Sequence, residues 1–192
     1  DGQISQDEVT AARSSASRIA KSSKAGPKPP IADAKYSDAF DRSKLDVWLP
    51  KNSAESTPIV VFFHGGGFKG GDKNNVRLRD FIELPQRGVA LASGNYPLKD
   101  NIEASGEWGH LPTIFDETQK ALAYIRSNAN EWGIDADRMV LAGSSAGTVI
   151  SQYLAYAKKE DVEAVLALQT PYSVDLVINE MTASSPEMFF YT

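Results

Sequence analysis

Two short glycine-rich segments contain the residues that could do chemistry. The first, Gly143-Ser144-Ser145-Ala146-Gly147, follows an apolar run at residues 139–142 and precedes a helical pattern. A strand, a sharp turn and a helix in this order place Ser145 on a strained turn, with its hydroxyl exposed above a parallel sheet. Glycines are needed on both sides because larger side chains would collide with the neighbouring strand or helix. The pattern predicts that Ser145 is a nucleophile; the alternative is a small turn residue.

The second segment lies upstream, at the end of another expected strand. Residues 57–63 form a continuous apolar run that ends in His64-Gly65-Gly66-Gly67-Phe68. Adjacent glycines after a strand leave backbone N–H groups free to bind the oxyanion that develops in acyl transfer. We therefore expect oxyanion donors among these glycines; the alternative is that they only allow a tight turn.

Several other pieces follow in a fixed order between about residues 44 and 172. They are Gly71-Asp72-Lys73, Asn95-Tyr96-Pro97, Asp116 in an expected helix, and residues 132–138 before the serine segment. As a set, these segments resemble the α/β-hydrolases and are similar to esterases and lipases of the hormone-sensitive-lipase and carboxylesterase type. Ser144 stands where many of those relatives have aspartate.

The resemblance implies both a fold and a reaction. The fold is an α/β structure with a doubly wound, mostly parallel sheet, of which this chain would form the N-terminal two-thirds. The reaction is cleavage of a small-molecule carboxylic ester through an acyl-enzyme on Ser145, without a cofactor. The oxyanion would be held by the N–H groups of Gly66, Gly67 and Ala146.

The catalytic triad is incomplete in this sequence. In the family the order along the chain is serine, then an acid, then histidine, whereas His64 and His110 both precede Ser145 and no histidine follows it. A serine hydroxyl needs an adjacent base. We therefore expect a piece of a longer protein, inactive by itself, with the triad acid and histidine beyond Thr192. The alternatives are a degenerate, non-catalytic and calcium-linked binding protein, or a hydrolase acting on peptides or other acyl groups.

The residues around the two segments have expected roles of their own. The resemblance places His64 at a strand end, where it shapes the loop rather than acting as a base. His110 lies in a polar segment and is expected on a loop surface or a pocket rim. Asp116 is expected to make structural hydrogen bonds, and Asp72 and Lys73 to cap or salt-bridge the oxyanion loop. Candidates for the substrate pocket, with core packing as the alternative, are the aromatic residues Phe68, Tyr96 and those near the C-terminus.

The N-terminus carries a separate signal. Asp1-Gly2-Gln3-Ile4-Ser5-Gln6-Asp7-Glu8 matches the second half of an EF-hand loop. In that interpretation Asp1, Gln3 (through its carbonyl), Ser5 and Glu8 are calcium ligands, and an exit helix follows. The alternative is a capping box between Ser5 and Glu8. Because the first ligand positions are missing, tight calcium binding is not expected.

Proline, glycine and the apolar pattern divide the chain. We expect a partial EF-hand loop with its exit helix at 1–21, a Pro/Ser-rich linker at 22–35 and the hydrolase domain at 36–192. Strands and helices alternate along that domain, which predicts a parallel, doubly wound sheet. The expected strands are 44–50 (antiparallel), 57–63, 88–93, 138–142 and 162–169; the expected helices are 75–87, 111–132 and 146–158.

Composition excludes several other function classes. The net charge of −5 with no basic stripe argues against a nucleic-acid partner. No apolar run reaches the length of a membrane span, and the absence of cysteine excludes disulfides and cysteine-bound zinc. The compartment is not assigned, although a secreted or periplasmic protein is favoured, and the oligomeric state stays open.

Overall fold

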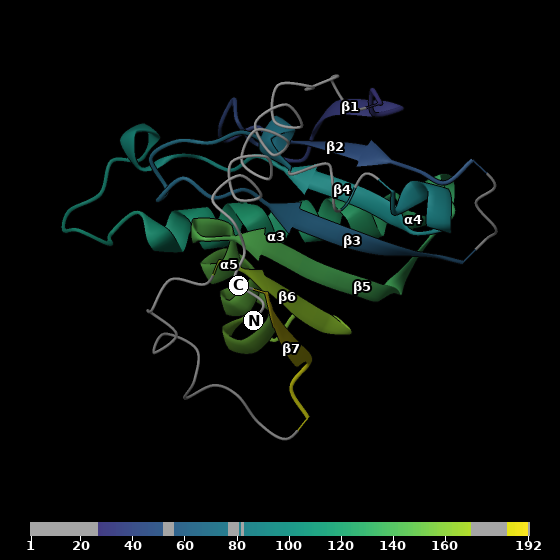
Figure 1. Cartoon of the computed structure of the whole chain (residues 1–192). Coiled ribbons are helices and arrows are strands. Elements are labelled where there is room, and N and C mark those ends of the chain that lie inside the picture. Colours follow the sequence, from purple (N-terminus) through teal and green to yellow (C-terminus); the bar gives the residue numbers. More distant parts are fainter. Residues whose placement is uncertain (1–26, 52–55, 77–80, 82, 170–183, 192) are drawn as a thin grey trace, which may run out of the picture.

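A seven-stranded sheet dominates the computed structural model, which describes residues 27–51, 56–76, 81, 83–169 and 184–191 (Figure 1). The strand order across the sheet is β1-β2-β4-β3-β5-β6-β7. The strands are β1 (Ile31–Lys35), β2 (Lys44–Trp48), β3 (Thr57–Phe63), β4 (Ala90–Gly94), β5 (Ile134–Ser144), β6 (Ala164–Leu168) and β7 (Glu187–Tyr191).

The strand directions confirm the expected mostly parallel sheet. Strand β2 pairs antiparallel with β1 and with β4, whereas β4, β3, β5, β6 and β7 pair in parallel. Parallel neighbours need crossover connections, and helices in those connections cover the sheet. Residues 57–63 are apolar without alternation because this central strand is covered on both faces.

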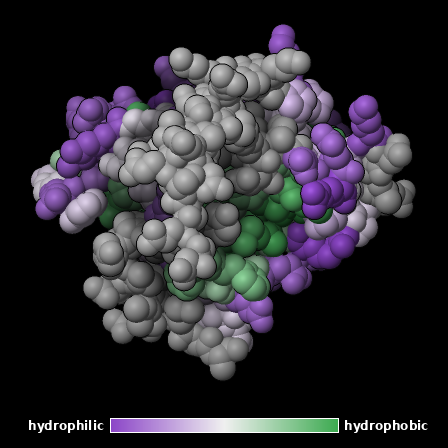
Figure 2. Space-filling view, viewed as in Figure 1, coloured by the Kyte–Doolittle hydropathy of each residue, from purple (hydrophilic) through white to green (hydrophobic). Residues whose placement is uncertain are grey.

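Each face of the sheet has its own hydrophobic cluster. Ile59, Val61 and Phe63 point into the larger cluster together with the buried side of α3, whereas Val60 and Phe62 point into the smaller one. In Figure 1, α3 passes behind the sheet, and Figure 2, from the same side, shows hydrophobic residues near the middle of the molecule with hydrophilic residues to their right. The sheet thus separates the core into two layers.

The long helix expected at 111–132 is two helices. Helix α3 (Leu111–Ser127) buries apolar residues at helical spacing, and the short α4 (Ala129–Trp132) ends at Gly133 with a φ of +66°. The break falls at Asn128, whose side-chain amide donates to the carbonyl of Tyr124 at 2.8 Å. This local hydrogen bond competes with the helical pattern, which explains why the single-helix prediction is wrong.

The other two helix predictions also need correction. Helix α5 spans Ala146–Gln152, and a π-helical turn at Tyr153–Ala157 then takes the place of further α-helix. The helix expected at 75–87 lies partly outside the described residues. Its described ends are 3₁₀ turns, Lys73–Asn75 and Pro85–Arg87. The second turn begins with proline, which lacks the N–H that a helix interior needs.

The element boundaries differ from expectation at several further places, including β2 and β6, which are shorter than expected. Strand β1 occupies residues 31–35, which we expected in the linker, because it pairs with β2 at the edge of the sheet. Strand β5 begins at Ile134 rather than at 138, and β4 extends to Gly94. The predicted EF-hand segment, with Asp1, Gln3, Ser5 and Glu8, lies outside the described residues.

Candidate active site

Ser145 lies at the carboxyl end of β5 in a strained backbone conformation. Its φ is +52° and its ψ is −114°, a region that residues with side chains rarely adopt. The surrounding structure holds it there: the N–H of Ser145 donates to the carbonyl of Leu168 at 3.0 Å, and Thr148 Oγ1 donates to the carbonyls of Gly143 and Leu168 at 2.6 and 2.9 Å. The half-buried serine is therefore fixed on a sharp turn between β5 and α5, as the sequence predicts.

The glycines around Ser145 are required by space. A Cβ on Gly147 would lie against the carbonyl oxygen of Phe63, 2.5 Å from its carbonyl carbon and 2.8 Å from the carbonyl oxygen of His64. A Cβ on Gly143 would meet the backbone of Gly147 and would lie 2.5 Å from the backbone nitrogen of Thr148. The start of α5 can therefore reach the end of β3 only without these side chains.

The second glycine segment forms a tight loop beside this turn. Gly66, Gly67 and Phe68 all have positive φ values, of +122°, +60° and +61°. The carbonyl of Gly66 accepts the N–H groups of Lys69 and Gly70 at 3.0 and 3.2 Å, which closes the loop. We call residues 64–72 the oxyanion loop, after its predicted role.

The oxyanion loop lies against the serine turn. A Cβ on Gly65 would be 2.8 Å from the carbonyl oxygen of Ser144 and 3.3 Å from the Cβ of Ser145. Within the described part of the chain, the N–H groups of Gly66, Gly67 and Ala146 donate no hydrogen bond. The structure therefore brings together the two segments that the sequence singled out, with backbone donors that the fold itself does not use.

His64 is buried beneath the oxyanion loop rather than free to act as a base. Its Nδ1 lies 2.8 Å from the carbonyl oxygen of Gly65, its Nε2 lies 3.3 Å from Nη2 of Arg42, and its ring stacks on Tyr96 at 4.3 Å. Burial, with the charge of Arg42 adding to it, lowers the pKa of His64 below its usual value. Both ring nitrogens are engaged, which agrees with the expected loop-shaping role.

Arg42 is a residue that the sequence analysis missed. It precedes β2 and is only 26% exposed. Its Nε donates to the carbonyl of Tyr96 at 3.0 Å, and its Nη2 donates to the carbonyl of Gly71 at 2.9 Å and to Asn95 Oδ1 at 3.3 Å. No motif identified Arg42, because these contacts depend on pairing between segments that are distant along the chain.

Asp72 and Lys73 hold the far end of the loop, as expected. Asp72 accepts the N–H of Asn74 at 2.9 Å and so caps a 3₁₀ turn. The buried Lys73 makes ion pairs with Asp46 at 2.8 Å and with Asp33 at 2.9 Å. Burial opposes the charge of Lys73, but its carboxylate partners raise its pKa overall. The loop is thereby tied to β1 and β2.

The predictions for the remaining aromatic residues and for His110 have different outcomes. Tyr96 is fully buried and its hydroxyl donates to the carbonyl of His64 at 2.7 Å, so core packing is the correct alternative. Phe68 is buried and packs edge-on against Tyr96 and His110. Of the two places expected for His110, a loop surface or a pocket rim, the loop surface is wrong: His110 is 2% exposed, and burial lowers its pKa. Among the described residues, neither ring nitrogen of His110 has a hydrogen-bond partner.

Two acidic neighbours on α3 have different roles. Asp116 is exposed and makes an ion pair with Lys158 at 3.0 Å, which agrees with a structural rather than a catalytic role. Glu117, which the sequence analysis did not single out, is buried and accepts from Ser43 Oγ at 2.6 Å. Helix α3 is thereby tied to the residue before β2.

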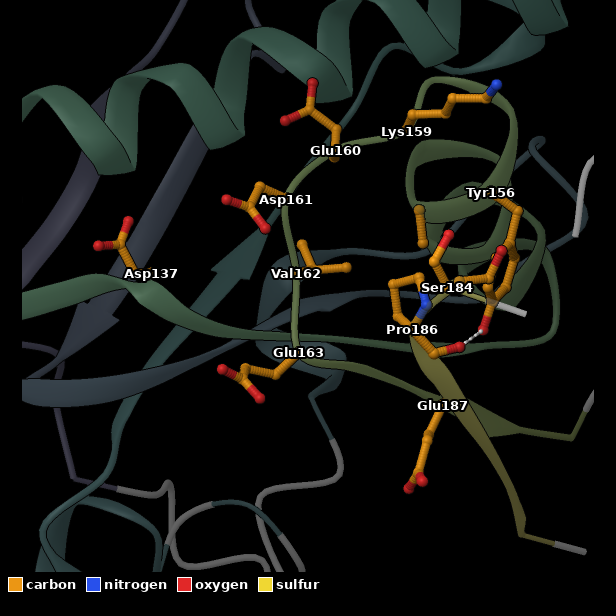
Figure 3. Close-up of a pocket in the computed structure, with 12 residues that line it drawn as sticks. Asp137, Tyr156, Lys159, Glu160, Asp161, Val162, Glu163, Ser184, Pro186 and Glu187 are labelled. Carbon is orange, nitrogen blue, oxygen red and sulfur yellow. Dashed lines mark hydrogen bonds between the residues drawn. The ribbon is translucent and has the colours of Figure 1, made fainter. Parts of the chain in front are cut away.

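A large pocket of about 770 Å³ lies at the opposite end of the sheet from Ser145 (Figure 3). Asp137, Val162 and Glu187 line it at the amino ends of β5, β6 and β7. Ligands of open α/β sheets bind outside the carboxyl ends of the strands. The pocket therefore does not belong to the serine site.

Among the described residues, no group of three or more histidine or acidic side chains could hold a metal ion. Within the same ranges, none of the helices combines the length and the apolar character that crossing a membrane requires.

The strand order and the serine turn together define the class of the chain, which is an α/β-hydrolase fold. The chain belongs to the BD-FAE family, whose model matches residues 45–185. A solved structure of esterase 2 from Thermogutta terrifontis, phosphoramylated by tabun, is similar with a TM-score of 0.69 and 18% identity. That match covers 86% of this chain and 72% of the esterase. The resemblance stated from the sequence is thus confirmed for family and fold.

Several of the relatives carry esterase names. Probable carboxylesterase 6 of Arabidopsis thaliana is 30% identical over 151 residues, which are 72% of this chain and 43% of that protein. Fumonisin B1 esterase of Sphingopyxis macrogoltabida is 28% identical over 114 residues, which are 54% of this chain and 21% of that protein. The chain therefore spans less than half the length of these two relatives.

Proposed function

We propose that the protein containing this chain is a carboxylic ester hydrolase that forms an acyl-enzyme on Ser145. The observation that carries the proposal is the contact between the strained serine turn and the oxyanion loop, where unused N–H groups lie beside the serine. Strain of this kind persists only where the surroundings enforce it, and it gathers at functional sites. The esterase names of several relatives support the same reaction class.

The proposed reaction has two steps. The hydroxyl of Ser145 attacks the ester carbonyl and the alcohol leaves, after which water releases the acyl group. The N–H groups of Gly66, Gly67 and Ala146 bind the oxyanion of each tetrahedral intermediate, where one such donor contributes about 10²–10³-fold in rate. Because no histidine follows Ser145, we propose that the triad acid and histidine lie beyond Thr192.

Two serines that are neighbours in the sequence provide the test. In the full-length protein, Ser145→Ala should abolish hydrolysis of a short-chain ester and labelling by a phosphonate probe. Ser144→Ala is the matched control: Ser144 Oγ contacts only Gln169 Oε1, at 3.3 Å, within the described residues, so this variant should keep most of the activity. Hydrolysis retained by Ser145→Ala, or lost equally in both variants, would refute the assignment.

Substrate range separates the alternatives within the class. The same turn and nucleophile occur in hydrolases of different substrates, so matched ester, amide and thioester substrates should be compared. We expect the highest kcat/KM for the ester. A full-length sequence without any histidine after Ser145 would instead favour a binding protein with a degenerate hydrolase domain.

A further inference from the structure

The surroundings of His64 select one tautomer of its imidazole. Guanidinium nitrogens donate hydrogen bonds and never accept them, so Nε2, which faces Nη2 of Arg42 at 3.3 Å, must be the unprotonated acceptor. A carbonyl oxygen only accepts, so Nδ1, which lies 2.8 Å from the oxygen of Gly65, must carry the hydrogen. A doubly protonated ring would place two donors face to face at Arg42.

We propose that Arg42 is a positioning residue for the oxyanion loop: it holds His64 in the Nδ1–H tautomer, and His64 in turn fixes the peptide between Gly65 and Gly66. The role of that peptide in catalysis rests on the proposed function. The tautomer of His64 and its dependence on Arg42 do not.

The orientation of one peptide links the imidazole to the site. The peptide between Gly65 and Gly66 is trans, as are the other described peptides, and in a trans peptide the C=O and the N–H point in opposite directions. The Gly65 carbonyl points at His64 Nδ1, so the Gly66 N–H points away from the imidazole. With its φ of +122°, Gly66 can flip this peptide at little steric cost. An outside restraint is therefore needed.

The imidazole is itself held from several sides. Tyr96 stacks on one face at 4.3 Å and donates its hydroxyl hydrogen to the His64 carbonyl. A Cβ on Gly71 would be 2.9 Å from His64 Cε1, so glycine is required where the ring passes the loop. Packing fixes where the ring lies, whereas the acceptor at Nδ1 and the Arg42 donor at Nε2 together decide which nitrogen carries the proton.

Arginine suits this position for reasons of charge and geometry. Its guanidinium stays protonated at all relevant pH values and presents donors in a planar fork. Besides His64, the fork of Arg42 reaches the carbonyls of Gly71 and Tyr96, which belong to the two segments on either side of the ring. A lysine has one point of attachment and could not satisfy these acceptors together.

The first test reads the tautomer directly. The sequence contains only two histidines, so long-range ¹H–¹⁵N correlation spectra of the ¹⁵N-labelled chain give two imidazole patterns, and His110→Gln assigns the one from His64. We expect a hydrogen on Nδ1 and none on Nε2 of His64 at pH 7.5. A hydrogen on Nε2 would overturn the proposal, whatever the activity of any variant.

The second test removes the donor. In Arg42→Met, the single His64 tautomer should become a mixture with Nε2–H. Arg87→Met is the matched control, because Arg87 is exposed and pairs only with Glu83, at 2.8 Å, and it should leave the His64 pattern unchanged. An unchanged pattern in a folded Arg42→Met variant would refute the role of Arg42. If that variant does not fold, the measurement on the unmodified chain still decides.

The third test measures the consequence in the full-length enzyme. Arg42→Met should lower kcat for an ester about 10–100-fold, part of the effect of one oxyanion donor, with KM changed less than about threefold. Adding Arg42→Met to a His64→Gln variant should lower kcat by less than a further factor of about three, because both residues act through the peptide between Gly65 and Gly66. If the kcat losses of the two single variants multiply in the double variant, the proposal is overturned. Loss of activity in Ser144→Ala together with the expected tautomer would overturn only the proposed function.

Discussion

Replacing Gly147 with alanine should destabilise the protein, although alanine is the better helix former. Gly147 lies in the first turn of α5, where Gly→Ala normally stabilises a helix by about 1 kcal/mol. Here the new Cβ would lie 2.5 Å from the carbonyl carbon of Phe63 and 2.8 Å from the carbonyl oxygen of His64. Helix propensity therefore predicts that the variant is more stable, whereas packing predicts that it is less stable.

The distances decide which effect wins. Carbon atoms reach their best separation at about 3.5–4.0 Å, so α5 and the end of β3 must separate by about 1 Å. Both partners are backbone, which cannot rotate away as a side chain can. Overpacking of this kind costs about 1–3 kcal/mol and sometimes more. Because neither backbone partner can rotate away, we take the upper end of this range, about 3 kcal/mol. Subtracting the helix gain of about 1 kcal/mol leaves an expected net loss of about 2 kcal/mol for Gly147→Ala.

Urea denaturation of the chain measures this loss. With a denaturant slope of about 2 kcal/mol/M, the midpoint should fall by about 1 M. Gly70→Ala is the control, because a Cβ on Gly70 would meet nothing within 4 Å; it should be neutral or gain a few tenths of a kcal/mol. A Gly147→Ala variant as stable as the unmodified chain would show that α5 is not held against β3 as described.

Three other predictions use the same assay. Ser145→Gly should be about 1 kcal/mol more stable than Ser145→Ala, because relief of positive-φ strain outweighs the added freedom of glycine in the unfolded chain; the reverse order would argue against strain. Lys73→Met should lower the free energy of unfolding by about 3–5 kcal/mol because it leaves Asp46 charged and buried. The control Lys35→Met breaks an exposed pair and should lower it by only about 0–1 kcal/mol. In the folded chain, burial lowers the pKa of His64 below its ordinary value of 6.5. The unfolded chain therefore takes up a proton at a higher pH than the folded chain, so the free energy of unfolding should fall as the pH drops from about 7 to 5. A constant urea midpoint over this range would contradict the prediction.

The sequence predicts the parts of the fold that depend on local pattern. Continuous apolar runs identify β3, β5 and β6 because a central parallel strand is buried on both faces. The two glycine segments identify the serine turn and the oxyanion loop because only glycine allows the close approaches measured at Gly65 and Gly147. Steric requirements of this kind leave a signature in the residue types themselves.

Features that depend on contacts between distant segments were missed. Arg42 lies 22 residues before His64, and no local pattern marks an arginine that will meet strand ends from elsewhere in the sheet. Strand β1 carries polar residues because it is an edge strand, so its composition suggested a linker. The ring of His110 packs against Phe68, which is distant along the chain and which no local pattern connects to it. In each case the tertiary environment, rather than propensity, determines the outcome.

Burial without a hydrogen-bond partner among the described residues makes His110 an unusual group near the loop. Its ring packs 5.7 Å from that of Phe68, the residue after the loop glycines, and 6.1 Å from the exposed Trp108. A buried imidazole without hydrogen bonds costs stability, so replacing it with an apolar residue of similar size should gain it. We expect His110→Leu to be at least as stable as the unmodified chain, and by up to about 1 kcal/mol more stable. A loss of more than about 1 kcal/mol in urea denaturation would mean that the ring nitrogens do have partners, such as bound water.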